Sequence, residues 1–333
     1  MAEESSHGSR DPGKRRPAAG SHTLFPSAPQ QAPRWTSGRE CWVFRADSPE
    51  QLCGHHPNLI RCTGLAEEAF EYLLYSPLCE GMDGPFHVAA GAGSHAVGIT
   101  RTQIVVSRDP HADGLRRSVT RVPLEDVTHL EIGCALLAGW LVIHVRGSEG
   151  AESHVVPFRS QGMRHFRAVV RAFRVGSLRP GPNPGPEREW TEVWAGVPAY
   201  LRSELEPLLE EGERPLAILR SPERWTGERR LWRSRSRCDS APGLLVATRG
   251  GLLWAASEPR TRPEGLAFGV NVTVARAERV AWAAIGEAGG LGVLRLQVGP
   301  GPSAHELEVR FEGQDVVAAE DFVQLVHHWS DRP

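Results

Sequence analysis

The sequence predicts a mainly β (α+β) protein made of two tandem small antiparallel β-barrels of about seven strands, each closed by a C-terminal α-helix. Three observations lead to this fold class. The second half of the chain repeats the first, and apolar residues within each repeat alternate with a period of two, as in strands. Each repeat also ends in a stretch whose apolar residues have helical spacing.

The repeat becomes visible when the chain is shifted by 153 residues. Residues 121–174 then align with 274–327 without a gap and are identical at 13 of 54 positions. The identical pairs include Ile132/Ile285, Leu141/Leu294 and Phe158/Phe311. A repeat of this length is a whole domain, so we expect a duplicated domain and not a solenoid of short repeats.

Strands are predicted where short apolar or alternating blocks lie between Gly, Pro and charged turns, as in 95–109, 291–298 and 305–311. Within 291–298, Leu294, Leu296 and Val298 share one face, because side chains alternate along a strand. About seven such strands fit into each repeat.

A closing helix ends each repeat, and a short helix is expected ahead of each, over 65–75 and 198–211. The predicted apolar stripes of the closing helices are Phe166, Val169, Val170 and Phe173 in the first repeat, and Phe322, Val323, Val326 and Trp329 in the second. The arginines predicted on the remaining surface of the first closing helix are Arg164, Arg167, Arg171 and Arg174.

This order of elements resembles the PH-like superfamily, especially its bacterial PH and GRAM-like members. Those members show a strand of the form TRxxLhh, here 100–106, and a step of the form hPhxxh, here 122–127. The second copy keeps Thr248 and Arg249 but has Arg276 in place of Pro123. The resemblance implies small barrels that bind lipids, peptides or proteins.

These observations divide the chain into six segments. They are a disordered N-terminal tail (1–35), an N-terminal segment with a short helix (36–84), PH-like domain 1 (85–175), a Pro/Gly linker (176–190), a connecting helix (191–211) and PH-like domain 2 (212–330).

Composition limits the possible partners and the compartment. The formal net charge of −2 gives no basic field for nucleic acid. The start of the chain lacks the apolar core of a secretion signal, and the longest apolar run, 134–143, is about half of the ~20 residues that a membrane helix needs. We therefore expect a cytoplasmic protein, with a membrane-peripheral location as the alternative.

Sequence motifs give no support for catalysis, a cofactor or a metal. Glycine-rich stretches lack the G-x-G-x-x-G pattern, and no nucleophile, zincin or P-loop motif occurs. One set of possible zinc ligands is Cys53, His55, His56, Cys62 and Cys79. Its spacing fits no known zinc pattern, which favours buried cysteines and surface histidines, with a metal-stabilised N-terminal segment as the alternative.

The strongest candidate for ligand binding is the segment 214–237, which holds eight arginines and two tryptophans. Guanidinium groups suit phosphate, and in lipid-binding PH domains the first two strands and their loop hold the anionic headgroup. The candidate residues are Arg224, Trp225, Arg230, Trp232, Arg233, Arg235 and Arg237. The alternative is a solvated edge strand that its charges protect from aggregation.

The sequence therefore favours a non-enzymatic binding or scaffold protein with two tandem PH-like domains and an unidentified protein partner. The alternative is peripheral binding of anionic lipid headgroups or polyphosphate through 214–237. An uncharacterised enzyme is a third possibility without a supporting motif, and the sequence is compatible with an oligomer.

Overall fold

The computed structural model describes residues 42–65, 70–77, 93–110, 116–135, 137–147, 150–176, 189–226, 229–230, 233–234, 237–257, 269–301 and 304–330, and for 225–239 it gives strand pairing only. The tail 1–35 and most of the linker 176–190 lie outside these ranges. Among the described residues, no helix is long and apolar enough to cross a membrane.

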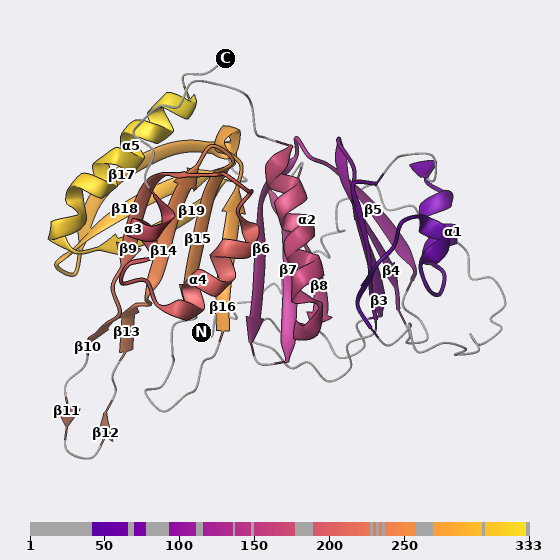
Figure 1. The fold of residues 1–333 in the computed structure, drawn as a ribbon, viewed down its shortest axis with the longest axis horizontal. Helices are drawn as coiled ribbons and strands as arrows, with labels where there is room; N and C mark the ends of the chain where they lie inside the picture. The colour runs from indigo at the N-terminus through magenta and orange to yellow at the C-terminus, as the bar shows by residue number, and fades with distance from the viewer. Residues whose placement is uncertain are drawn as a thin grey trace, which may run out of the picture.

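The first half of the chain forms a five-stranded antiparallel sheet, three further strands and a helix (Figure 1). The sheet has the order β1-β2-β3-β4-β5. Its strands are β1 (Phe44–Arg45), β2 (Tyr72–Ser76), β3 (Ser94–Ile99), β4 (Gln103–Asp109) and β5 (Ser118–Pro123), with η2 (Pro49–Gln51) and α1 (His56–Arg61) between β1 and β2. Then follow β6 (Val127–Ala135), β7 (Ala138–Arg146), β8 (Ala151–Arg159), η4 (Ser160–Gly162) and α2 (Met163–Val175).

The second half repeats the order of four strands, three strands and a helix, with the additional short strands β10–β13 (within 224–240) between β9 and β14. It begins with α3 (Trp190–Trp194), α4 (Ala199–Leu205), η5 (Glu206–Leu208), β9 (Pro215–Ser221), β14 (Gly243–Thr248), β15 (Gly251–Ser257) and β16 (Gly269–Ala275). It continues with η6 (Ala277–Arg279), β17 (Val280–Ala288), β18 (Leu291–Val298), β19 (His305–Phe311), η8 (Gly313–Asp315) and α5 (Val316–Ser330). β17 lies 153 residues after β6, and η8 lies 153 residues after η4.

The two halves share one sheet, which differs from the two closed barrels predicted. Strand β6 pairs with β16 from Leu130↔Val274 to Ala135↔Gly269, giving the seven-stranded order β8-β7-β6-β16-β15-β14-β9. β17, β18 and β19 form a separate three-stranded sheet. The described sheets are open, and the edge of β6 pairs with a strand of the other half.

The predicted helix stripes are largely confirmed. Phe166, Val169, Val170 and Phe173 of α2 are fully buried, as is Phe322 of α5, while Val323 is half-buried. Arg174 was predicted on the surface and is instead buried. Its guanidinium reaches into the second half, where Nη2 donates to Glu213 Oε1 at 2.5 Å and to Thr248 Oγ1 at 2.9 Å. A buried arginine of this kind is stable because each charged group has a partner.

The short helix predicted over 65–75 is wrong at its C-terminal end, where residues 72–76 form β2. Leu73 packs in the core beneath α1, whereas Leu74 packs in the core beneath α2, so both faces of β2 are buried. A strand buried on both faces reads as a continuous apolar run and cannot be distinguished from a helix by periodicity. The second short helix is confirmed in part, as α4 and η5.

Candidate functional site

The arginine-rich segment 214–237 contains β9 and most of the connection from β9 to β14, the first two strands of the second half (Figure 1). This connection folds into a hairpin of β10 (Arg224–Thr226) with β13 (Arg237–Ser240), and β11 (Arg229–Arg230) with β12 (Arg233–Ser234). Arg230 pairs with Arg233 across the hairpin, and Trp225 pairs with Cys238. The Arg224 side chain is exposed, while Trp232 and Arg235 lie outside the described residues. Convergence of these side chains on a ligand stays a prediction.

Two other arginines of the segment are engaged within the fold. Arg214 forms an ion pair with Glu189 at 3.1 Å. Arg220 donates to the backbone carbonyls of Val193 at 3.3 Å and Ala195 at 2.5 Å. Both therefore hold the α3 region against β9.

The Cys/His set of the N-terminal segment does not assemble into a ligand cluster within the described residues. His56 is fully buried, with Nδ1 2.9 Å from Ser107 Oγ and Nε2 3.0 Å from Ser94 Oγ, so it fastens α1 to β3 and β4. Burial lowers the pKa of His56 to about 4. Cys53 is half-buried and Cys62 is exposed. Residue Cys79 lies outside the described ranges.

A different group of ligating side chains gathers where the two halves meet, and we call it the seam cluster: His129, Glu131, His144 and His305. His129 and Glu131 lie two residues apart on β6 and so share a face. His144 is the register partner of His129 on β7, and the two rings stack with centroids 4.0 Å apart. His305 is the first residue of β19 and belongs to the other half, with its ring centroid 4.6 Å from that of His129.

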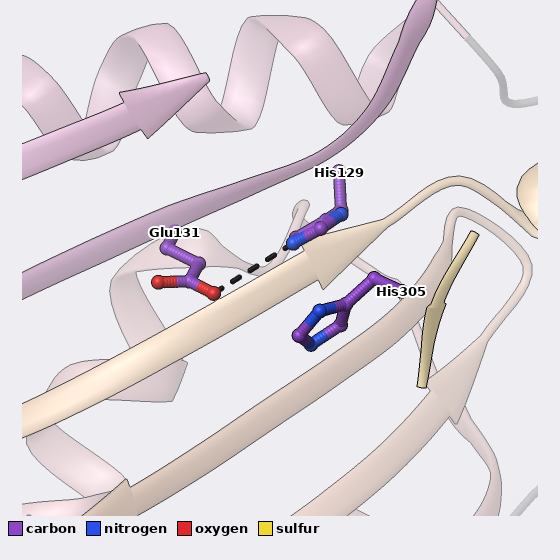
Figure 2. Close-up of side chains that lie close together, drawn as sticks. All are labelled: His129, Glu131 and His305. Atoms are coloured by element: carbon purple, nitrogen blue, oxygen red, sulfur yellow. Dashed lines mark ion pairs between the residues drawn. The ribbon is translucent and has the colours of Figure 1, made fainter. Parts of the chain in front are cut away.

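Figure 2 shows three members of the seam cluster, His129, Glu131 and His305, lying close together. Glu131 Oε1 lies 3.6 Å from His129 Nε2 and 3.4 Å from His144 Nε2. One ligand atom each of His129, Glu131 and His305 lie within 4.8 Å of one another. Ligands at about 2.1 Å from a tetrahedral ion are ~3.4 Å apart, so the three ligand atoms would have to move closer together to hold one ion. The His305 ring, now tilted by 30° from that of His129, would have to turn out of this near-parallel arrangement. Because the His129 and His144 rings are stacked, one ion cannot lie in both ring planes.

The hydrogen bonds of Thr128 are compatible with a neutral His129 that is protonated on Nδ1. The Thr128 hydroxyl donates to the backbone carbonyl of His144 at 3.1 Å, and a hydroxyl has one proton. When the hydroxyl donates in this way, its oxygen accepts from His129 Nδ1, also at 3.1 Å. A neutral His129 then carries its lone pair on Nε2, and this buried atom has no hydrogen-bond partner among the described residues. The arrangement leaves Nε2 available as a ligand atom.

The charges of the seam cluster suit a cation. Burial lowers the pKa of His129 to about 4, and burial also lowers the pKa of His305. Burial by itself would raise the pKa of Glu131, but N–H groups of the His129 and His144 imidazoles outweigh this and hold the pKa well below its usual value. A metal ion on His129 Nε2 would take the place of a proton there. At neutral pH the cluster therefore presents an ionised carboxylate beside neutral His129, the protonation state that metal ligands need.

A second set of hydrogen bonds orients Glu131 across the seam. Asn271 of β16 donates from Nδ2 to Glu131 Oε2 at 3.3 Å. Trp140 of β7 in turn donates from Nε1 to Asn271 Oδ1 at 3.4 Å. Outer partners of this kind fix the direction of a metal-ligating carboxylate.

Sequence reasoning missed the seam cluster because its members are scattered over 177 positions and match no spacing pattern. The pattern of His129 and Glu131 at alternate positions of a strand was the available signal. Comparison of the chain with protein-family models, with curated proteins and with solved structures finds no match.

Proposed function

We propose that this chain is a non-enzymatic binding protein made of two PH-like units, and that it takes up a divalent transition-metal ion at the seam cluster. The observation that carries this proposal is the convergence of His129, Glu131 and His305, whose ligand atoms lie within 4.8 Å of one another. Imidazole nitrogens with one carboxylate are a donor set for zinc and its neighbours in the first transition row.

Binding at this position would join the two halves of the chain. His129 and Glu131 belong to the first half, while His305 belongs to the second. An ion held by all three ligands binds the folded chain and not the unfolded chain, so it stabilises the folded state. A ligand present at 100 times its Kd adds about 2.7 kcal/mol.

Metal binding is tested by titrating the chelator-treated full chain with zinc in a calorimeter, and with cobalt by visible absorption. We expect one ion per chain, a Kd in the micromolar range or below, and a rise in Tm with added zinc. His305→Gln and Glu131→Gln should each weaken binding by about 10-fold or more, because each removes a ligand. His327→Gln, on the exposed face of α5, is the matched control. Unaltered binding in the first two variants would refute the site.

The PH-like assignment of the units is supported by the succession of their strands. In each half, four strands that follow one another along the chain are also neighbours in a sheet. Three more strands, joined as hairpins, come next in the chain, and an amphipathic helix follows them. The order is β2-β3-β4-β5 in the first half and β9-β14-β15-β16 in the second. PH-like folds host several kinds of binding, so the partner must come from the sites. Recovery of a stoichiometric protein partner from native cytosol tests the scaffold function.

A second candidate function is binding of an anionic surface by the arginine hairpin, favoured by its place between the first two strands of the second half. A pocket of about 320 Å³ at the hairpin base contains Arg220 but also Glu223, Glu312 and Asp315, so an anion would bind on the hairpin and not in this pocket. Sedimentation with acidic and neutral vesicles at low and high salt tests it, with Arg230→Glu/Arg233→Glu as the variant. Equal, negligible binding to both vesicles would exclude it.

A further inference from the structure

The pairing of β6 with β16 joins two different edges of the repeated unit. β6 is the first strand of the three that follow the sheet of the first half, whereas β16 is the last strand of the sheet of the second half. Residues 130–135 run antiparallel to 274–269 in this pair. An interface between unlike surfaces of two similar units is heterologous, and it leaves one unused edge of each kind.

The unused edges are β17 and β5. β17 corresponds to β6 at the offset of 153, and β5 corresponds to β16, since both end a four-stranded order and 118–123 falls on 271–276. Among the described residues each has a neighbouring strand on one side only. The β17 label lies toward the left of the molecule beside α5, and the β5 label lies in the right half with α1 beyond it (Figure 1).

We propose that the chain assembles head to tail, with β17 of one copy pairing antiparallel with β5 of a second copy. The internal pair of β6 with β16 gives the register. The offset of 153 is added to a residue number of β6 to reach β17, and it is subtracted from a residue number of β16 to reach β5. Ala283 would therefore lie opposite Arg121 of the second copy, as Leu130 lies opposite Val274, and the pairing would continue to Ala288 opposite position 116.

The exposure of β17 supports this pairing. Ile132 of β6 is 2% exposed and lies opposite Val272, while its counterpart Ile285 of β17 is 38% exposed. In the proposed register Ile285 lies opposite Val119, the counterpart of Val272. Trp282, at the start of the same edge, is 45% exposed. Apolar residues exposed on an edge strand favour pairing with another strand.

Charge also agrees with the proposed pairing. The exposed Glu287 would lie directly opposite Arg117, a cross-strand pair of opposite charge. Arg117 already forms an ion pair with Asp109 at 2.9 Å, so Glu287 would add a second carboxylate to it. Helix α5 packs alongside β17, where Ser330 donates to the carbonyl of Ala281 at 3.2 Å and Ala283 is buried. The part of the proposed strand pair that is exposed is therefore Ile285, Gly286 and Glu287.

The consequence is an assembly that grows by one chain at a time. Each added copy covers one edge and brings another, so the copies form a ring if the rotation closes and a filament if it does not. This inference is independent of the metal proposal, because the seam cluster lies at the internal pair. Glu131→Gln should therefore leave the assembly unchanged.

The first test is sedimentation velocity of the full chain over a range of concentrations. We expect species larger than a monomer whose fraction rises with concentration. Ile285→Asp should shift association to at least ~10-fold higher concentration, because it places a charge in the proposed contact. Val317→Asp is the matched control, since Val317 of α5 is 63% exposed and lies outside the proposed strand pair. A monomer at all concentrations up to about 100 μM would overturn the proposal.

The second test fixes the register by cysteine cross-linking. Ala284 and Thr120 would face each other between copies, so the double variant Ala284→Cys/Thr120→Cys should give a ladder of disulfide-linked species under mild oxidation. Ala284→Cys/Arg121→Cys is the matched control, because a shift of one residue places the side chain on the opposite face. The wild type and the single variants give the background from native cysteines. Ladders of equal intensity in both double variants would overturn the register.

Discussion

Arg174 is the residue whose replacement tests most directly how the two halves hold together. Its side chain is 1% exposed and that of Glu213 is 4% exposed, and the guanidinium bonds both carboxylate oxygens, at 2.5 and 3.2 Å. Its Nη1 also donates to the backbone carbonyl of Leu208. Arg174→Met keeps much of the side-chain volume but leaves the Glu213 charge buried without its partner. Breaking a buried ion pair in this way costs about 3–5 kcal/mol.

The assay is urea unfolding followed by tryptophan fluorescence, comparing the free energy of unfolding. Arg171→Met is the matched control on the same helix, because Arg171 lies 3.4 Å from Glu210 in a pair whose side chains are 48% and 31% exposed. Exposed pairs contribute about 0–1 kcal/mol. The double variant Arg174→Met/Glu213→Gln should lose less stability than Arg174→Met, since no buried charge remains. A loss below 1 kcal/mol in Arg174→Met would refute the reasoning.

Three further predictions concern pH and packing. Burial lowers the pKa of His56 to about 4 and that of His95 to about 3, so the unfolded chain binds protons at a higher pH than the folded chain does. The free energy of unfolding should therefore fall as the pH drops below about 6.5, by up to about 1.4 kcal/mol per pH unit for each imidazole. Urea unfolding at pH 7 and at pH 5 measures this loss. Gly251→Ala should lower the free energy of unfolding by about 3 kcal/mol or more, since φ is +121° and a Cβ would lie 2.1 Å from a carbonyl oxygen of β16. Gly313→Ala is the control, because a Cβ at Gly313 would meet open space, and it should change the Tm little. Phe166→Ala should cost about 3–5 kcal/mol in the same unfolding assay, because its fully buried ring stacks on another at 3.8 Å; a loss under 1 kcal/mol would contradict the packing.

The candidate site shows where prediction from sequence stopped. The segment 214–237 was identified by composition, and its hairpin pairing is in the structure, but its ligand stays a prediction. His56 was grouped with cysteines near it in sequence, whereas its hydrogen bonds are to serines 38 and 51 residues away. The seam cluster unites His129 with His305, which no local pattern relates.

The sequence by itself determined the local structure of this protein. A period of two and a spacing of three to four residues follow from backbone geometry, so most strands and the stripes of α2 and α5 were predictable. The offset of 153 residues likewise set which elements correspond. Only the tertiary structure decided which edge pairs with which, because an open edge can accept any compatible strand and the choice depends on residues far apart. The β6–β16 pairing, the buried Arg174 and the seam cluster all result from that choice, and the free edges of β5 and β17 are what it leaves.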